Sequence, residues 1–356
     1  MEDGMEIKNK KIFTKLILIM IPILFLFSYT FLFAVDVEWM SGDVKYRHMM
    51  GEWESLDIGY HLANGDVIKT GEDGEATLLD GDVYINISPN SEFTVSERFD
   101  NNKHKSSFML FLGRLKFKLT KKSTNEPEVV TQAVNLTVRG TEFDVASGHD
   151  GSTLVVIEKG IVAVSGKEKT LVLRKGEGSQ IKFGEEPEKK FKVITKVIDW
   201  GKWLAQSREN IKGNELYILT KILKKFKEID EEIKQHEKIR SESLKKKMEY
   251  LKLRDTSLAE NKNDEASQYS KKAGIESKRA FHAIVNIRFL ALSSIGLKDM
   301  ADNIFRSIEK PSTKIRNIKA NIDEIFDSIE DKYIYKGDRE RLEKKSKKKK
   351  GCLDLF

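Results

Sequence analysis

The stretch N-L-T-V-R-G-T-E-F-D-V, from Asn135 to Val145, decides the fold that this sequence encodes. It is strand-length and rich in β-branched residues, and its apolar and polar residues alternate, which predicts a half-buried β-strand. Gly140 interrupts the strand between Arg139 and Glu142, which predicts a β-bulge or a close approach by another backbone. The alternation predicts two faces: Leu136, Val138 and Gly140 on one side, and Thr137, Arg139 and Thr141 on the other.

The surrounding residues, 36–186, repeat this kind of segment. Strands of four to seven residues separated by Gly, Asp and Asn turns predict an all-β domain, either a sandwich, a barrel or a solenoid. Asp80-Gly81 predicts a hairpin with a type I′ turn. Gly113 and Gly160 separate further predicted strands, which lie at 107–112 and 114–119, and at 153–158 and 161–165.

Residues 187–342 have a different period and the opposite charge. The segment 36–190 carries 20 Lys and Arg against 26 Asp and Glu, whereas 191–356 carries 39 against 27. A helix is predicted from Asn214 to beyond Leu251, and others at 265–292, 297–308 and 315–329. A small bundle is preferred over a coiled coil with a partner, because residues 261–264 are typical of a turn between long helices. The apolar seam of the first long helix is Leu219, Ile222, Phe226, Ile229, Ile233 and His236.

Residues 1–35 predict a signal peptide or a signal anchor. A lysine-rich start precedes an apolar run of about twenty residues, long enough to cross a bilayer. Cleavage after Ala34 and retention as an anchor both stay open. The chain is therefore expected to be exported to the periplasm or cell envelope, with anchoring in the inner membrane as one outcome. Residues of the apolar segment are Leu16, Ile19, Ile23, Phe27, Phe31 and Ala34.

The last segment, 343–356, is expected to be a basic disordered tail. Six lysines between Lys344 and Lys350 could attract anionic lipid headgroups, but a solvated tail is the simpler interpretation. The single cysteine, Cys352, excludes an intramolecular disulfide.

No catalytic arrangement emerges from the residue spacing. The six histidines are scattered, with no pair at metal-ligand spacing, and turn chemistry accounts for Asp80 and Asp82. We therefore expect no enzyme activity, no cofactor and no metal site. Nucleic-acid binding is not expected either, because the export signal argues against it and acidic residues interleave with the basic ones.

Motifs along residues 41–183 resemble the FecR domain family, in that family's order. They are G-E-W-E-S-L (51–56), N-G-D-V-I-K-T-G (64–71), L-L-D-G (78–81), S-P-N-S-E-F (88–93), F-L-G-R-L (111–115), V-R-G-T-E-F (138–143), V-I-E-K-G-I-V-A-V (156–164) and L-R-K-G-E (173–177). The founding member regulates iron-dicitrate uptake through a cytoplasmic helical domain that acts on a sigma factor. At most about fifteen residues precede the apolar segment here, so the resemblance implies an extracytoplasmic β interaction module instead.

The signature positions are expected to be structural. An Arg139 and Glu142 pair at the bulge would hold the strand in register, so Arg139→Ala should lower stability before it lowers binding. The signature residues are Gly65, Asp66, Asp80, Gly81, Val138, Arg139, Gly140, Thr141, Glu142, Phe143, Gly160 and Gly176.

The sequence thus predicts a non-enzymatic cell-envelope protein. In this hypothesis the β domain binds a protein or a glycan, which would be an envelope protein or a cell-wall polymer. The helices position the β domain or make the protein a homo-oligomer. The alternative is a membrane-anchored component of a FecR-like transmembrane signalling system. N-terminal sequencing of the mature protein separates the two.

Overall fold

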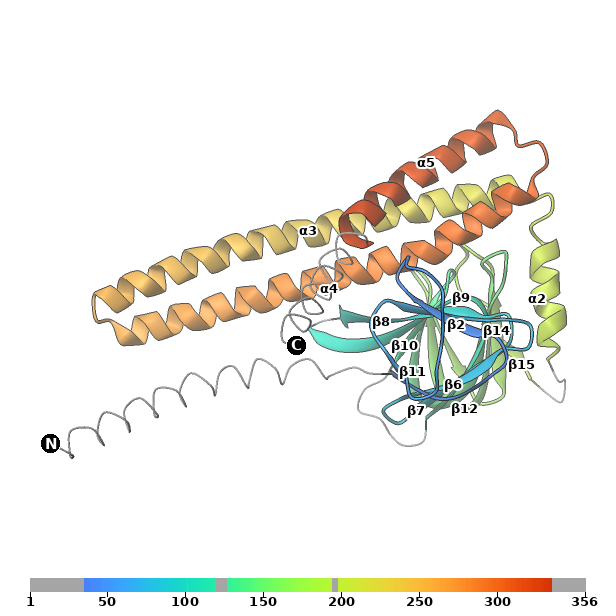
Figure 1. Ribbon diagram of the computed structural model, residues 1–356, viewed down its shortest axis with the longest axis horizontal. Helices are drawn as coiled ribbons and strands as arrows, with labels where there is room; N and C mark the ends of the chain where they lie inside the picture. The colour runs from blue at the N-terminus through green and yellow to red at the C-terminus, as the bar shows by residue number, and fades with distance from the viewer. Residues whose placement is uncertain (1–34, 101, 120–126, 194–197, 335–356) are drawn as a thin grey trace, which may run out of the picture.

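A computed structural model describes residues 35–100, 102–119, 127–193 and 198–334. It confirms the predicted order of an all-β region followed by long helices (Figure 1). The expected signal or anchor at 1–35 lies outside the described residues except for Val35, which begins the first strand, and the expected tail at 343–356 lies wholly outside them. The last strand runs to Lys192, beyond the expected boundary at 186 and 187.

Among the described residues, fifteen strands form one hydrogen-bonded sheet, which rolls around an apolar core. The strands are β1 (Val35–Ser41), β2 (Val44–His48), β3 (Glu54–Ser55), β4 (His61–Leu62), β5 (Asp66–Thr70), β6 (Glu75–Asp80), β7 (Val83–Ile87), β8 (Glu92–Asp100), β9 (Lys103–Leu119), β10 (Glu128–Val130), β11 (Asn135–Ser147), β12 (Thr153–Ser165), β13 (Thr170–Arg174), β14 (Glu177–Ile181) and β15 (Phe191–Lys192).

The strand β9 joins the parts of this sheet. Its first ten residues pair with β8, and its last residues pair with β7 and β11. The prediction of two strands separated at Gly113 was wrong, because Gly113 bends one long strand at a φ of +91° instead of ending it. A Cβ there would lie 2.2 Å from Ser91 Oγ. Gly160 likewise lies inside β12, at a φ of +82°.

The bulge expected in the opening stretch is present in β11. The register with β12 shifts between Arg139 and Glu142, and Gly140 has a φ of +58°. One part of the predicted alternation was wrong, because Thr141 is buried rather than on the outer face. The extra residue of a bulge inverts the alternation that follows it.

Asp80-Gly81 does form a hairpin, between β6 and β7. Its turn differs from the predicted type I′, because Gly81 has a φ of +58° while Asp82 is not among the residues with positive φ. Positive φ at the first central position alone is the type II′ arrangement. Glycine at that position therefore suffices to make the turn.

Within residues 198–334, four helices and a short π-helix follow the strands. The sequence-predicted helices at 265–292 and 297–308 are one continuous helix, because Gly296 without a proline does not stop a helix whose neighbours are well packed. Asn261, at a φ of +59°, makes the predicted turn between the two longest helices. The elements are α2 (Trp200–Glu209), α3 (Glu215–Ala259), α4 (Asn263–Ser307), α5 (Thr313–Ile329) and η1 (Glu330–Ile334).

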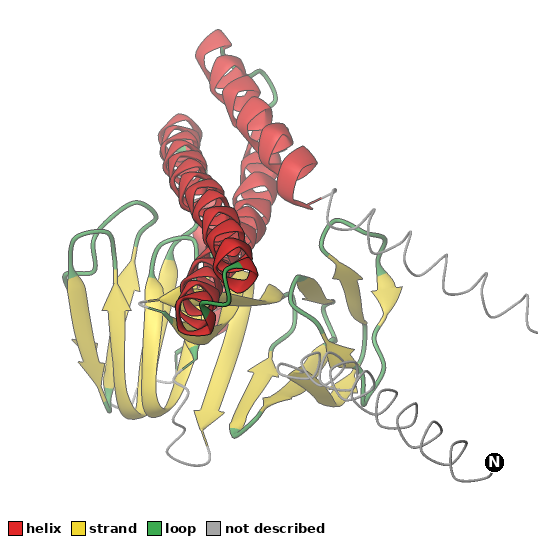
Figure 2. Cartoon of the chain, turned by 90° about the vertical axis from the view of Figure 1, so that its left-hand side faces the viewer, coloured by secondary structure: helices red, strands yellow, loops and turns green. Residues whose placement is uncertain are grey.

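The helices pack as a bundle against the β region (Figure 2). The first half of α3, the second half of α4 and α5 enclose one apolar core, in which the Phe226 and Phe326 rings meet edge to face. Met109 and Phe183 of the β region belong to the same core. Shared burial of this kind fixes the position of the bundle on the sheet.

The helix α4 is long and apolar enough to cross a membrane by length and composition. However, 67% of its most apolar window is buried within the protein. The apolar character of α4 is therefore that of a core helix.

Candidate functional site

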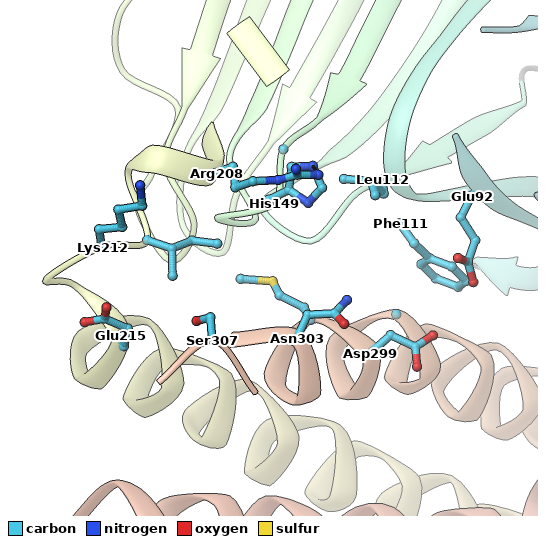
Figure 3. Close-up of a pocket in the computed structure, with 14 residues that line it drawn as sticks. Glu92, Phe111, Leu112, His149, Arg208, Lys212, Glu215, Asp299, Asn303 and Ser307 are labelled. Atoms are coloured by element: carbon cyan, nitrogen blue, oxygen red, sulfur yellow. Dashed lines mark hydrogen bonds between the residues drawn. The ribbon is translucent and has the colours of Figure 1, made fainter. Parts of the chain in front are cut away.

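A cavity of about 530 Å³ lies where the helices meet the β region (Figure 3). Ligand pockets in proteins commonly enclose about 300 to 1,000 Å³, so this volume suits a short peptide segment or a small sugar. Four parts of the chain line the cavity: Glu92, Phe111 and Leu112 on β8 and β9; Gly148 and His149 after β11; Arg208, Ile211, Lys212 and Glu215 along α2 and α3; and Gly296, Asp299, Met300, Asn303 and Ser307 near the end of α4.

Hydrogen bonds hold α2 beside the loop that follows β11. The His149 N–H donates to Ser207 Oγ at 2.9 Å, and Asn210 Nδ2 donates to Asp150 Oδ2 at 2.9 Å. On the opposite wall, Gly296 allows Phe111 to lie directly against α4, since a Cβ on Gly296 would meet Phe111 Cδ1 at 2.2 Å. The cavity is therefore shaped by contacts between distant segments.

One side of the cavity is acidic. Arg47 Nη2 lies 3.7 Å from Glu92 Oε1 and 3.9 Å from Asp299 Oδ2, and Lys69 Nζ lies 3.6 Å from Glu92 Oε2. Burial and then the charge of Asp299 raise the pKa of the Glu92 carboxyl, although Lys69 and Arg47 oppose this. Burial likewise raises the pKa of Asp299. This side would favour a cationic group, because such a group would stabilise both carboxylates.

The other side carries basic groups. Arg208 Nη2 lies 3.2 Å from His149 Nε2, so the imidazole accepts from the guanidinium in its neutral form. Burial and then the charge of Arg208 lower the pKa of His149. Lys212 is paired with Glu209 at 2.6 Å. Figure 3 shows Arg208 and Lys212 away from Glu92 and Asp299, with apolar lining between.

These groups are suited to binding. Phe111, Leu112, Ile211 and Met300 offer an apolar surface, with Glu92 and Asp299 on one side and Arg208, Lys212 and Glu215 on the other. Across the described parts of the chain, no group of three or more His, Cys, Asp or Glu side chains is placed to hold a metal ion.

The predicted signature residues lie elsewhere, and none of them lines the cavity. Asp66 is buried beneath a loop, where it accepts from the Ala63 N–H at 2.7 Å and contacts His48 Nδ1 at 2.6 Å. Gly65 has a φ of +95° in the same loop. Asp80 and Gly81 form the β6–β7 hairpin, and burial raises the pKa of Asp80.

The remaining signature residues surround the β11 bulge or a nearby turn. Glu142 pairs with Lys159 at 2.7 Å and with Lys116 at 3.8 Å, whereas the side chain of Arg139, its predicted partner, lies outside the described part of the structure. Three others are placed by packing or turn geometry: Val138 is buried, Phe143 stacks on Phe117 at 4.9 Å, and Gly176 has a φ of +78°.

Sequence reasoning missed the cavity. Glu92, Phe111 and Leu112 lie within two of the quoted motifs, S-P-N-S-E-F and F-L-G-R-L, which was the available signal. Nothing in the spacing of Arg208 or Asp299 relates them to those motifs, because they meet only after the helices dock.

Comparisons with known proteins match only part of this chain. Two structures of one protein from Parabacteroides distasonis ATCC 8503, described as "a putative anti-sigma factor" and determined at 1.65 and 2.50 Å resolution, are 16% and 15% identical to this chain. Each alignment has a TM-score of 0.31 and covers 35% of this chain and 59% of the other, so this chain spans under two thirds of that protein. No curated protein matches the chain.

A family model described as FecR protein matches residues 66–163, which extend from β5 into β12. The match falls within the residues whose motif order resembles that family. Residues 66–163 of this chain are therefore a FecR domain.

Proposed function

We propose that this chain is a non-enzymatic, exported cell-envelope protein that binds a segment of another envelope protein in the cavity between its FecR domain and its helices. The observation that carries the proposal is the cavity of about 530 Å³, with the carboxylates of Glu92 and Asp299 on one side, Arg208 on the other and an apolar surface between them. The apolar N-terminal segment supports export.

A protein segment suits the cavity better than a glycan. Sugar rings pack on aromatic faces, and Phe111 is the one aromatic side chain among the lining residues. A peptide can instead place an apolar side chain on Met300 and Phe111 and present a cation to Glu92 and Asp299. Its acidic end would then approach Arg208.

The helices have a positioning role in this proposal. The cavity needs both α4 and the β region, so docking of the bundle completes the binding site. A family domain that lacks this bundle would not have the same pocket.

A phage-displayed random peptide library tests the proposal. Asn303 is exposed within the lining, so Asn303→Trp should fill the cavity without unfolding the protein. Lys314→Trp on exposed α5 is the matched control. We expect enrichment of peptides with a cation and an anion separated by apolar residues on the wild type and on Lys314→Trp, and loss of enrichment on Asn303→Trp.

Soluble cell-wall glycan fragments form the second arm of that experiment. Enrichment of no peptide class, or equal enrichment on both tryptophan variants, would contradict peptide binding in the cavity. Glycan binding that Asn303→Trp abolishes would replace the protein ligand with a cell-wall polymer.

A specific observation also favours a second function, that of an anchored signalling component. The first strand, β1, begins at Val35, immediately after the apolar segment, and Val35 is 3% exposed and paired with Leu62. Cleavage after Ala34 would create a charged α-amino group on Val35, a buried residue, and burying a charge without a partner is costly, which favours retention of the segment. The FecR domain would then be held at the membrane surface.

Mapping the N-terminus of the mature protein after cell fractionation tests this second function. We expect an intact segment in the membrane fraction. A soluble protein that begins at Val35 would eliminate the signalling route.

A further inference from the structure

The distal hairpin, residues 238–282 of α3 and α4, has an unusual seam between its two helices. In the first half of α3, large apolar side chains are buried at spacings of three and four. The same spacing continues toward the end of the helix at Ala259, but there it falls mainly on polar residues. Ser243 and Ser257 are buried there, opposite small alanines of α4. The distal seam residues of α3 are His236, Arg240, Ser243, Lys247, Tyr250, Arg254 and Ser257.

Four large apolar side chains of distal α3 lie beside the seam and not in it. Leu244, Met248 and Leu258 are 39%, 55% and 49% exposed, and Leu251 is partly exposed. Spacings of four, three and seven put these four residues, the distal stripe, on one face of the helix. A two-helix hairpin that buries serine and alanine while exposing leucine gains little stability from its own seam.

The distal stripe continues a face of α3 that is covered closer to the β region. Going back from Leu244 by sevens gives Glu237, Asp230 and Leu223. Leu223 packs on the helical core. Glu237 lies close to Tyr333 of η1, because burial and then Glu237 raise the pKa of that tyrosine. The covering by α5 and η1 reaches Ile334, and the hairpin extends past the end of α5 in Figure 1. Exposed apolar surface in continuity with a covered face marks an interaction site.

We propose that a second copy of this chain covers the distal stripe, with the two hairpins antiparallel about a two-fold axis at Leu251. Its three leucines are symmetrical about that residue, because Leu244 and Leu258 each lie seven positions from it, whereas Met248 has Arg254 as its counterpart. Antiparallel pairing then puts Leu244 of each copy opposite Leu258 of the other, as an isologous interface requires. The inference goes beyond the proposed function, in which the helices only position the binding site, and refines the homo-oligomer that the sequence predicts as their other role.

The charges of the distal hairpin fit the same pairing. Its tip is acidic, with Asp264 and Glu265, and the level of Ser277 is basic, with Lys278 and Arg279. Ser277 accepts from Lys247 at 3.2 Å, which fixes the level of the two helices relative to each other. Rotation about Leu251 brings the acidic tip of each copy to the basic level of the other.

The same charges disfavour another occupant from this chain. The lysine-rich segment 344–350 would meet the basic level around Lys245, Lys246 and Lys247, where like charges repel. A second copy instead offers both an apolar stripe and opposite charges.

Site-specific cross-linking of the full chain in cells tests the proposal. Cys352→Ser removes the single native thiol, and Leu251→Cys, Leu244→Cys and Leu258→Cys introduce new ones. A short bismaleimide is the reagent, because it tolerates a wider range of separations and orientations than the specific geometry of a disulfide does. Glu249→Cys, two residues from the axis on the opposite face of the helix, is the matched control.

We expect Leu251→Cys to cross-link to itself, and coexpressed Leu244→Cys and Leu258→Cys to cross-link to each other. Glu249→Cys should give no cross-linked product. In detergent, sedimentation should give about twice the chain mass of 40.9 kDa, and Leu251→Lys should reduce the mass to one chain without loss of helix content.

Several outcomes would overturn the pairing. Self-cross-linking of Leu244→Cys without the mixed product would mean parallel hairpins. Adducts of another mass would mean a different protein, and a stripe that thiol reagents reach only in the absence of anionic vesicles would mean a lipid surface. Peptide binding by Leu251→Lys tests the cavity separately from the dimer. If the monomeric variant still binds peptide, ligand binding in the cavity does not need dimerisation, and the cavity proposal stands apart from this one.

Discussion

Asn286 of α4 forms hydrogen bonds to both backbone groups of Phe99 in β8. The Phe99 N–H donates to Asn286 Oδ1 at 2.8 Å, and Asn286 Nδ2 donates to the Phe99 carbonyl at 3.1 Å. The side-chain amide thus satisfies the strand as a neighbouring strand would. His282, one turn earlier, stacks on the Phe99 ring at 3.8 Å, so one residue of the sheet is held by two residues of the helix.

Asn286→Ala should lower the free energy of unfolding by about 1 to 3 kcal/mol, because it leaves a backbone N–H and a carbonyl of β8 without their partners. Urea denaturation measures the change. Gln268→Ala, at an exposed site on the same helix, is the control and should leave stability nearly unchanged. Equal stability of Asn286→Ala and Gln268→Ala would show that apolar packing alone holds α4 on the sheet.

Gly160→Ala should destabilise the FecR domain more than Gly176→Ala does. Both glycines have positive φ, +82° and +78°, which strains any other residue. A Cβ on Gly160 would also lie 2.4 Å from Thr141 Cγ2 and 2.6 Å from the Gly140 carbonyl, whereas a Cβ on Gly176 meets nothing within 4 Å. We expect about 1 kcal/mol for Gly176→Ala and clearly more for Gly160→Ala in thermal unfolding. The reverse order would remove the structural role assigned to the bulge contact.

Asp299→Asn should lower the pKa of Glu92 toward its ordinary value, because it removes a like charge beside that carboxyl. In the wild type, the folded-state pKa values of both carboxyls are raised. Their contribution to stability is therefore present below the ordinary carboxyl pKa and is lost as pH rises through the raised values. Carboxyl-carbon NMR titration of Glu92 measures the shift. An unchanged Glu92 titration in Asp299→Asn would mean that burial alone sets it.

His149→Leu should flatten the loss of stability on mild acidification. Burial lowers the folded-state pKa of His149, so unfolding takes up a proton once the pH falls below the ordinary histidine value of about 6.5. Wild-type stability contributed by the neutral imidazole should thus fall as pH drops from about 7 to 5. Urea denaturation across that range should show a smaller slope for His149→Leu. Parallel curves for the two proteins would assign the slope to other groups.

Much of the strand and helix content follows from short-range pattern. Alternating residues around Leu136 and the seam from Leu219 to His236 each predicted their element, since burial on one face imposes the period of that element. Errors arose where a glycine could either end an element or bend it. Gly113 and Gly160 were interpreted as the ends of strands, and two helices were predicted on either side of Gly296; in each case packing from elsewhere carries the element through.

The candidate site was predictable only in part for the same reason. Glu92 and Phe111 stood in recognisable FecR motifs, but their neighbours Arg208 and Asp299 come from helices more than ninety residues later in the chain. No local period links such positions. Their proximity depends on the shared core of Met109, Phe183 and the helices, which exists only after docking.

By itself the sequence determined the order of a β region and a helical region, the FecR character of the first, and the bulge at Gly140, because period, turn chemistry and glycine conformation are local properties. Tertiary structure alone decided which strands are continuous, where Asn286 fixes the bundle on β8, and that a cavity lies between them. It also decided that Leu244, Leu251 and Leu258 lie beside the helix seam instead of within it, since which face of a helix is buried depends on what packs against it.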